Sequence, residues 1–189
     1  MMLQLDFTIF PVLHTDRLIL KEITDKDATE LFNMRSNPEI MKYVDRPAPN
    51  SINDILELIE RMRVMKTKGE GISWGIFKKD NPDLKIGNIG LFRIIAEHYR
   101  AEIGYMLAIE EQQRGIMYEA MQAVLQYGFD VMNLHSMEAN INPENIGSQK
   151  LLEKAGFVRE AYFRENYYFN GRFIDSAIYS LLKKDRREH

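Results

Sequence analysis

Residues 101–157 constrain the fold of this chain more than any other stretch. They open with the apolar and aromatic segment 103–108, whose composition predicts a buried β-strand. Acidic and amide residues then lead to Arg114 and Gly115, and a helical pattern follows. Apolar and small residues recur there at three- and four-residue spacing and so share one helix face: Met117, Ala120, Met121, Val124, Leu125 and Gly128.

A second strand and a second helix complete this unit. Residues 137–141 have strand character, and the turn-forming residues 142–145 open the next helix. That helix is expected to end at Lys154, because Gly156 suits the left-handed position that follows many helices. A strand, a glycine turn, a helix, a strand and a helix together form a compact unit that favours ligand binding.

The turn at residues 112–117 has the properties of an anion-binding site. The first backbone N–H groups of a helix lack partners within the helix, and the aligned peptide dipoles make that end partly positive. Gly115, just before the helix, lets an anion approach the backbone closely. The segment is therefore interpreted as a cradle for phosphate. On this physics alone, a plain turn without a ligand explains the glycine at least as well.

The order of the motifs along the chain resembles one family. Residues 112–117 are similar to a Gln/Arg-x-x-Gly-x-Gly/Ala loop, residues 145–148 to an Asn-x-x-Ser segment, and the Lys-Ala-Gly-Phe of residues 154–157 follows. Residues 15–20 and 170–175 add to the likeness near the two ends of the chain. The sequence resembles the GNAT acyl-CoA N-acetyltransferases, in particular the branch that contains the ribosomal-protein alanine N-acetyltransferases. The resemblance covers residues 13–183.

The resemblance implies a fold. We expect a single-domain GNAT-like fold of the α/β (α+β) class over residues 1–189, with a short leader at 1–11 and a frayed tail at 184–189. A central mixed, mostly antiparallel sheet of roughly six to seven strands is expected, flanked by about four helices. The strands at 103–108 and 137–141 are expected to splay apart, so that the pantetheine arm of coenzyme A enters the gap between them.

Local patterns predict the remaining elements. Strands are expected at 18–20, 72–77 and 84–92, and helices over 28–34 and after Ser51. Residues 37–50 are loop-like, and residues 79–83 are expected to form a turn between two strands. A last hairpin is predicted from 157–169 and 173–182, around the strong turn signal Asn170-Gly171.

The resemblance also implies which residues hold coenzyme A. In the family, the loop binds the pyrophosphate through backbone amides, and Met117 stands here where many members carry Gly or Ala. Its side chain is therefore expected to turn inward toward the packing face of the helix. Acetyl-CoA is the expected co-substrate. The corresponding residues of this chain are Met106, Leu107, Ala108, Gln112, Gln113, Arg114, Gly115, Ile116, Met117, Asn140, Asn145 and Ser148.

Transfer of an acetyl group from a thioester to an amine sets two demands. The amine must be neutral to attack, and the departing thiolate must be stabilised or protonated. No covalent enzyme intermediate is needed, so we expect direct attack in a ternary complex. Neutralising a lysine amine near pKa 10.4 costs about 4 kcal/mol at neutral pH, whereas an α-amine at about 7.7 to 8.0 costs only about 1 kcal/mol. An amino-terminal acceptor therefore needs a weaker base, such as a water held by carboxylates.

Ser148 is the first catalytic candidate. Its hydroxyl, near the start of a helix, is placed to donate a proton or a hydrogen bond to the departing sulfur. Stabilisation of the helix end explains the serine equally well. Asn145 is expected to contact the coenzyme, although asparagine is also a favoured helix cap.

Several residues are candidates for the general base. In the resembled amino-terminal acetyltransferases, a Glu shortly before the last hairpin turn serves; Tyr167 is the nearest counterpart here, with Glu165 two residues earlier on the same strand face. Glu102, at the mouth of the strand 103–108, is a further candidate, as is Glu138. Tyr105 is expected to pack or to line the substrate site.

The composition argues against several other classes. Without Cys, the chain has neither a disulfide framework nor a thiol nucleophile. The His residues at 14, 98, 135 and 189 share no metal-ligand spacing, so no metal is expected. A net charge of −3 gives no general attraction to nucleic acid or to acidic membranes, and neither is an expected partner. The start lacks signal-peptide features and no apolar run reaches membrane-spanning length, so a cytoplasmic location is expected.

Four functions stay open at this level. The first is an acetyl-CoA-dependent N-acetyltransferase that acts on a protein amino terminus, with a ribosomal-protein-like acceptor. The second acts on a small amine, namely a polyamine, an aminoglycoside or an amino sugar. The third is a non-catalytic acyl-CoA-binding module, and the fourth is a structural interaction domain that binds no coenzyme. The expected partners are acetyl-CoA and the amine acceptor, and a homodimer is a further hypothesis.

Overall fold

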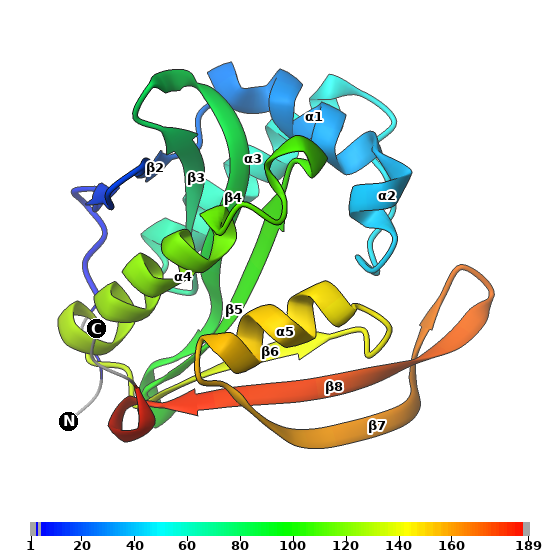
Figure 1. Ribbon diagram of the computed structural model, residues 1–189. Coiled ribbons are helices and arrows are strands. Elements are labelled where there is room, and N and C mark those ends of the chain that lie inside the picture. Colours follow the sequence, from blue (N-terminus) through cyan, green and yellow to red (C-terminus); the bar gives the residue numbers. More distant parts are fainter. Residues whose placement is uncertain (1–2, 4, 187–189) are drawn as a thin grey trace.

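The computed structural model describes residue 3 and residues 5–186. Its centre is one sheet in the strand order β1-β2-β3-β4-β5-β6-β8-β7 (Figure 1). The strands are β1 (Leu13–His14), β2 (Leu18–Glu22), β3 (Ile72–Lys78), β4 (Asn81–Ile95), β5 (Arg100–Leu107), β6 (Ser136–Ile141), β7 (Val158–Phe169) and β8 (Arg172–Leu182). The α-helices are α1 (Ala28–Ser36), α2 (Pro38–Met41), α3 (Ile52–Thr67), α4 (Ile116–Gln126) and α5 (Ile146–Lys154), and a π-helical turn at Tyr127–Val131 follows α4.

The strand pairing creates the opening between β5 and β6 that the family resemblance implied. Every neighbouring pair is antiparallel except β5 and β6, which are parallel. β5 and β6 pair only at their first residues, as far as Glu102 opposite Glu138. Beyond this point β5 stays paired with β4, and β6 with β8, so the two strands separate into a V. The predicted splay and the mixed, mostly antiparallel sheet are confirmed.

Helices cover the two faces of the sheet. In the view of Figure 1, α4 and α5 lie in front of the sheet and α3 lies behind it. The main core includes Met121 and Val124 of α4 together with Ile103 of β5. A second cluster joins α1 and α3 through Leu31 and Ile55. Because strand residues alternate between faces, each side chain of β5 belongs to one helix layer or the other.

Two short elements, β1 and α2, make the numbers of strands and helices larger than expected. Within the described residues the sheet has eight strands instead of six to seven, because β1 adds a pair with β2. The same part of the chain has five α-helices instead of about four, because α2 lies within residues 37–50, expected to be a loop. Asn37 caps α2 through its side-chain oxygen, and Pro38 occupies the first turn. Elements of two and four residues are too short to show a hydrophobic repeat.

The turns agree with the sequence at most positions. Gly156, after α5, has a φ of 96°, and Asn170 and Gly171 have φ values of 49° and 79° between β7 and β8. Positive φ at both central residues is typical of a tight hairpin turn. The turn between β3 and β4 is shorter than the expected 79–83, because β4 begins at Asn81 and the pairing continues through register shifts.

The expected leader (1–11) and tail (184–189) include residues 1, 2, 4 and 187–189, which lie outside the described residues. In the described part, Phe7 is buried, and the indole N–H of Trp74 donates a hydrogen bond of 2.7 Å to the Pro11 carbonyl. At the other end, Arg186 pairs with Asp130 at 2.9 Å. Across residue 3 and residues 5–186, no helix combines the length and the apolar character that crossing a membrane requires.

Candidate active site

The turn between β5 and α4 has the shape expected of an anion cradle. Gly115 is the N-cap residue of α4 and has a φ of 75°, a left-handed conformation that glycine adopts without strain. Gln113 is also left-handed, with a φ of 60°. Residues 112–115 are exposed, whereas Ile116 and Met117 are buried in the main core. The Met117 side chain therefore turns inward, as the sequence led us to expect, and the start of α4 stays accessible.

A network that the sequence analysis missed holds this turn in place. The Arg17 guanidinium donates to the Arg114 carbonyl at 3.1 Å and to Glu119 Oε2 at 2.6 Å. The Arg17 backbone N–H and the Thr15 hydroxyl donate to Glu119 Oε1, at 2.9 and 2.5 Å. Burial raises the pKa of Glu119, but these hydrogen bonds outweigh it, so that the pKa is lowered. The segment 15–20, which contributes to the family resemblance, thus supports the turn.

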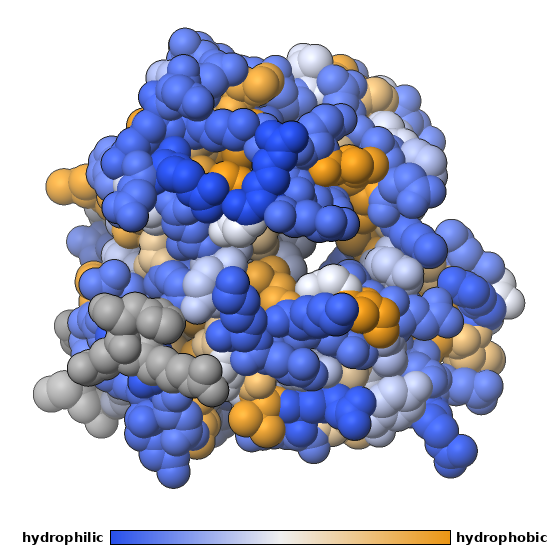
Figure 2. Space-filling model, viewed as in Figure 1, coloured by the Kyte–Doolittle hydropathy of each residue, from blue (hydrophilic) through white to orange (hydrophobic). Residues whose placement is uncertain are grey.

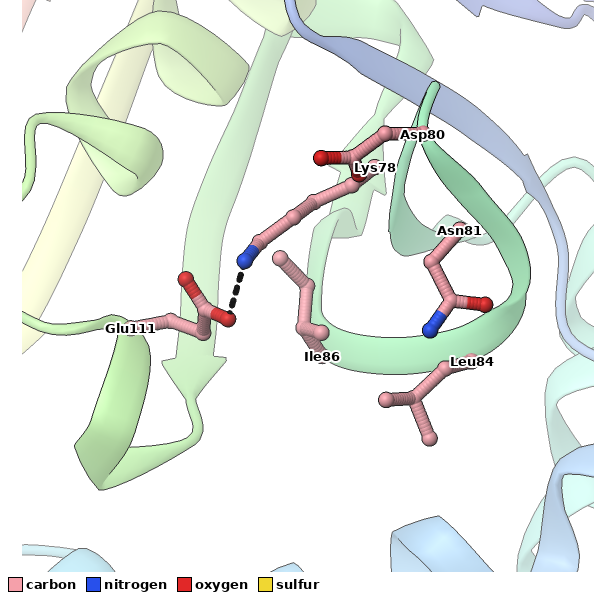
Figure 3. Close-up of a pocket in the computed structure, with 6 residues that line it drawn as sticks. All are labelled: Lys78, Asp80, Asn81, Leu84, Ile86 and Glu111. Carbon is pink, nitrogen blue, oxygen red and sulfur yellow. Dashed lines mark ion pairs between the residues drawn. The ribbon is translucent and has the colours of Figure 1, made fainter.

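A cavity of about 280 Å³ lies beside the turn, at the β3–β4 hairpin (Figure 3). An ion pair joins Lys78 to Glu111, and Arg114 lies 3.6 Å from the other carboxylate oxygen of Glu111. The Lys78–Glu111 pair ties the segment before Gln112 to β3. None of the predicted catalytic residues lines the cavity, so we assign it a supporting role. Its lining residues are Lys78, Asp80, Asn81, Leu84, Ile86 and Glu111.

The V between β5 and β6 is an open hollow. Figure 2 shows the molecule hollowed between the part that carries the β3–β4 hairpin and the part that carries α5 and the β7–β8 hairpin. Met106 and Leu107 lie on the β5 arm of the V, and Asn140 lies on the β6 arm. Gln112 Nε2 donates to the Leu107 carbonyl at 3.2 Å, which draws the cradle toward the end of β5. Ala108, just beyond that end, donates its N–H to the Ile86 carbonyl at 2.9 Å.

Tyr105 and Ser148 connect the two sides of the V. The Tyr105 hydroxyl lies 2.6 Å from Ser148 Oγ, and Ser148 is buried in the first turn of α5. The Ser148 backbone N–H donates to Asn145 Oδ1 at 3.0 Å, so Asn145 is the N-cap of α5. Its contact with coenzyme stays a prediction. Burial raises the pKa of Tyr105 to about 12, and its phenol therefore stays protonated at neutral pH.

Glu102 lies at the point where β5 and β6 separate. It forms an ion pair with Arg93 at 2.9 Å, and Glu138, opposite Glu102, is paired with Arg100. The pKa of Glu102 is raised, chiefly by burial and further by the charge of Glu138, while Arg93 opposes the shift. A carboxylate whose pKa is raised toward neutrality is a better base than an ordinary surface Glu.

Glu102 and Tyr105 belong to opposite faces of the sheet. They are three residues apart on β5, and side chains alternate along a strand. Tyr105 packs against the main core, so Glu102 belongs to the face that α1 and α3 cover. Asn88 shares that face, because it lies opposite Met106 on β4. Its side-chain oxygen is buried and has no hydrogen-bond partner within the part of the chain that the structure describes.

The structure places Glu165 and Tyr167 on the β7–β8 hairpin. The pairing shifts register between Phe163 and Tyr167, and Glu165 has a φ of 51°, so the two-residue alternation that placed both on one face does not continue through this bulge. The Glu165 N–H donates to Asp175 Oδ1 at 2.7 Å. The Tyr167 hydroxyl donates to the Asp45 carbonyl at 3.4 Å, which links the hairpin to the loop between α2 and α3.

Residues 17–158 match a family model described as an acetyltransferase (GNAT) domain. The match includes the cradle, both arms of the V and the whole of α5. The chain belongs to the GNAT acetyltransferase family.

Other GNAT acetyltransferases resemble it over almost their full length. The uncharacterized N-acetyltransferase YoaA of Bacillus subtilis (strain 168) is 37% identical over 93% of this chain and 98% of that protein. The ribosomal protein uS5-alanine N-acetyltransferase of Escherichia coli (strain K12) is 25% identical over 92% of this chain and 91% of that protein. The crystal structure of spermidine N-acetyltransferase from Vibrio cholerae in complex with CoA and spermine matches with a TM-score of 0.80 at 25% identity, over 90% and 98% of the two chains.

These findings confirm that the protein is an acyltransferase with acetyl-CoA as its co-substrate. They also confirm the single GNAT-fold domain. The roles of the individual residues in the cradle and the V stay predictions. No group of three or more His, Cys, Asp or Glu side chains that could hold a metal ion occurs among residue 3 and residues 5–186.

Proposed function

We propose that this GNAT acetyltransferase modifies the α-amino group at the amino terminus of a protein. The observation that carries the proposal is Glu102, a carboxylate with a raised pKa at the point where β5 and β6 separate. An α-amine needs only about 1 kcal/mol to become neutral at pH 7, against about 4 kcal/mol for a lysine-like amine. One carboxylate of this kind, acting directly or through a water, is sufficient for such an acceptor.

A small cationic acceptor is the runner-up, because a spermidine acetyltransferase is among the similar proteins. A polyamine carries several ammonium groups, and each of them requires an unengaged carboxylate or a comparable acceptor. Glu138 is paired with Arg100, and Glu102, the proposed base, is already in contact with Arg93, so neither is left to bind a further ammonium group. This charge balance supports an amino-terminal acceptor over a polyamine.

In the proposed reaction, residues on one face of the sheet remove the proton from the amine, and residues on the other face assist the departing sulfur. The backbone N–H groups of residues 112–117 hold the pyrophosphate of acetyl-CoA, and the pantetheine arm lies in the V. On one face the amine forms a bond to the thioester carbon, and Glu102 takes its proton through a water. On the other face the carbon–sulfur bond breaks, and the Ser148 hydroxyl donates a hydrogen bond to the departing sulfur. Tyr105 donates to Ser148 and so directs the Ser148 proton toward the sulfur.

A thiol-release assay with acetyl-CoA tests this function. The acceptors are peptides with a free or a blocked amino terminus, polyamines, aminoglycosides and amino sugars. We expect release with the free-terminus peptides and none with their blocked counterparts. Mass spectrometry of a peptide that also contains lysine should locate the acetyl group on the α-amine. A polyamine or aminoglycoside turned over with a kcat/KM about tenfold above that of the best peptide contradicts the proposal.

Homodimerisation and a cytoplasmic location, both expected from the sequence, stay predictions. Sedimentation velocity tests the first, and fractionation of cells that express the protein tests the second.

A further inference from the structure

Three arginines of α1, α3 and the loop before α3 form no ion pair with a carboxylate within the described residues. Arg35 lies in the last turn of α1, Arg46 in the loop between α2 and α3, and Arg61 on α3. Across the described residues, these three side chains form no ion pair and no hydrogen bond. Arg63, two positions after Arg61, differs in this respect, because it is paired with Asp25 and Glu60.

The positive charges of Arg46 and Arg61 both act on the guanidinium group of Arg35. Arg35 is half-buried, and this burial, together with the positive charges of Arg46 and Arg61, lowers its pKa. Like charges on a partly dehydrated surface cost free energy unless an anion joins them. Guanidinium groups also bind carboxylate and phosphate oxygens in a bidentate manner. The cluster is therefore suited to an anionic ligand.

The position of Arg46 relates the cluster to the reaction. Arg46 directly follows Asp45, whose carbonyl accepts the hydrogen bond from Tyr167 of the β7–β8 hairpin. The charge of Arg46 also reaches Glu102, where it partly offsets the rise in pKa that burial causes. The cluster and the proposed base thus lie on the same side of the V. This is the opposite side from the Tyr105–Ser148 contact.

Two carboxylates on this side of the V, Glu102 and Asp45, are within electrostatic reach of Arg46. Glu102 is already paired with Arg93. Burial raises the pKa of Asp45, and two arginines, Arg172 and Arg46, both act on it to oppose that rise. Within the described residues, neither Asp45 nor Glu102 thus forms an ion pair with Arg35, Arg46 or Arg61 on this side of the V.

We propose that Arg35, Arg46 and Arg61 bind an anionic part of the acceptor, so that the preferred substrate is a protein amino terminus followed by acidic side chains. This substrate class rests on the proposed function and narrows it. An extended peptide advances about 3.3 Å per residue, so carboxylates in its first few positions extend outward from the reacting amine. Arg46 and Arg61 are exposed and free to meet them. The same charges repel a polyamine.

Peptides that differ only in charge test the proposal. Two series share an amino-terminal alanine and continue with either Asp and Glu or Lys residues, and glucosamine 6-phosphate and spermidine represent small anionic and cationic amines. At low salt we expect kcat/KM to be about tenfold or more higher for the acidic series, and the difference to shrink as salt screens the charges. Arg46→Gln and Arg61→Gln should reduce the difference. Arg63→Gln, the matched control on the same helix, should leave it unchanged.

Calorimetry with acetyl-CoA separates this site from the coenzyme site. We expect the affinity for acetyl-CoA to be the same in all three variants. If Arg46→Gln or Arg61→Gln weakens acetyl-CoA binding in parallel with turnover, the arginines bind coenzyme phosphates and the proposal is overturned. Equal use of acidic and basic peptides, or a preference for spermidine, overturns it as well. Turnover of glucosamine 6-phosphate without turnover of any peptide supports anion recognition by the arginines and rejects the amino-terminal acceptor.

Discussion

The hydroxyl oxygens of Tyr105 and Ser148 lie 2.6 Å apart, although the two residues are 43 positions apart in the sequence. Tyr105 comes from the part of β5 beyond its pairing with β6, and Ser148 comes from the first turn of α5. The contact therefore spans the V that the coenzyme arm is expected to enter. A phenol with a pKa of about 12 keeps its proton at physiological pH, so Tyr105 can donate this hydrogen bond and leave the Ser148 proton available for another acceptor.

Ser148→Ala should separate chemistry from binding. If the Ser148 hydroxyl assists the departing sulfur, it acts chiefly in the transition state, so kcat should fall by about tenfold to several hundredfold while acetyl-CoA affinity stays nearly constant. Ser176→Ala is a matched control, because Ser176 is as buried as Ser148 and is not one of the residues assigned to the V. The Ser176 hydroxyl donates a hydrogen bond of 2.9 Å to the Asn166 side chain. This control should lose about 1 kcal/mol of stability and keep its kcat per folded molecule. Unchanged kcat in Ser148→Ala, with a lower Tm, removes Ser148 from the catalytic residues.

Gly115→Asp should weaken acetyl-CoA binding by roughly tenfold or more, because it puts a negative charge where the phosphate is expected to lie. Gly115→Asn is the matched control. Asn and Asp have similar sizes and both tolerate the positive φ of 75° at this position, so the two variants differ mainly in charge. Calorimetry should show clearly weaker binding for Asp than for Asn. Equal dissociation constants in two folded variants contradict a phosphate at this turn.

Arg17→Ala should destabilise the turn at residues 112–117 and leave the residues of the V unchanged. It removes the donor that joins the Arg114 carbonyl to Glu119. We expect a loss of about 1 to 3 kcal/mol of stability, since these are hydrogen bonds of a charged group, and an increase of about tenfold in the acetyl-CoA dissociation constant. Arg17→Ala and Glu119→Gln should be non-additive in a double-mutant cycle of Tm and affinity. A lower Tm with unchanged affinity indicates that the network serves the fold alone.

Because of Lys85, we expect the free energy of unfolding to rise with pH in the alkaline range. Lys85 is 2% exposed, and its ammonium lies 3.5 Å from the sulfur of Met34. Burial lowers its pKa to about 8, against the opposing attraction of Asp27 and Glu30. Between about pH 8 and the unfolded value of about 10.4 the unfolded chain binds more protons, so raising the pH favours the folded state. Below pH 8 the Lys85 ammonium is charged in both the folded and the unfolded state, so the folded state bears the full free-energy cost of burying that charge.

Lys85→Met should therefore stabilise the protein at pH 7, by up to about 3 kcal/mol if the new side chain packs without strain. It should also abolish the rise in stability between about pH 8 and pH 10. Lys79→Met, at an exposed position of the same hairpin, is the control and should do neither. Urea titrations across pH 6 to 10 measure both effects. The hypothesis fails if the wild type and Lys85→Met have parallel pH profiles.

Local sequence patterns were sufficient to locate the elements around the coenzyme site. The spacing of apolar residues marked α4, and the turn-forming residues 142–145 and Gly156 marked the two ends of α5. Gly156 has the left-handed conformation expected of it, and the Asn170-Gly171 turn forms where it was predicted. Such features depend on the backbone preferences of one or two residues and their immediate neighbours. For the same reason the bulge at Glu165 and the short helix α2 were missed, since both follow from tertiary pairing or capping more than from periodicity.

The sequence by itself thus determined the strand–turn–helix unit, its glycine turn and, through the order of its motifs, the family. Only the tertiary structure decided which distant side chains meet. Arg17 reaches Arg114 across 97 positions, and the charges of Arg46 and Arg61, from two other segments, act on Arg35. The physical reason is that local patterns report backbone conformation, whereas these contacts follow from the order in which the strands pair. That order, with β6 beside β5 for only a few residues, opens the V and assigns Glu102 and Tyr105 to its opposite faces.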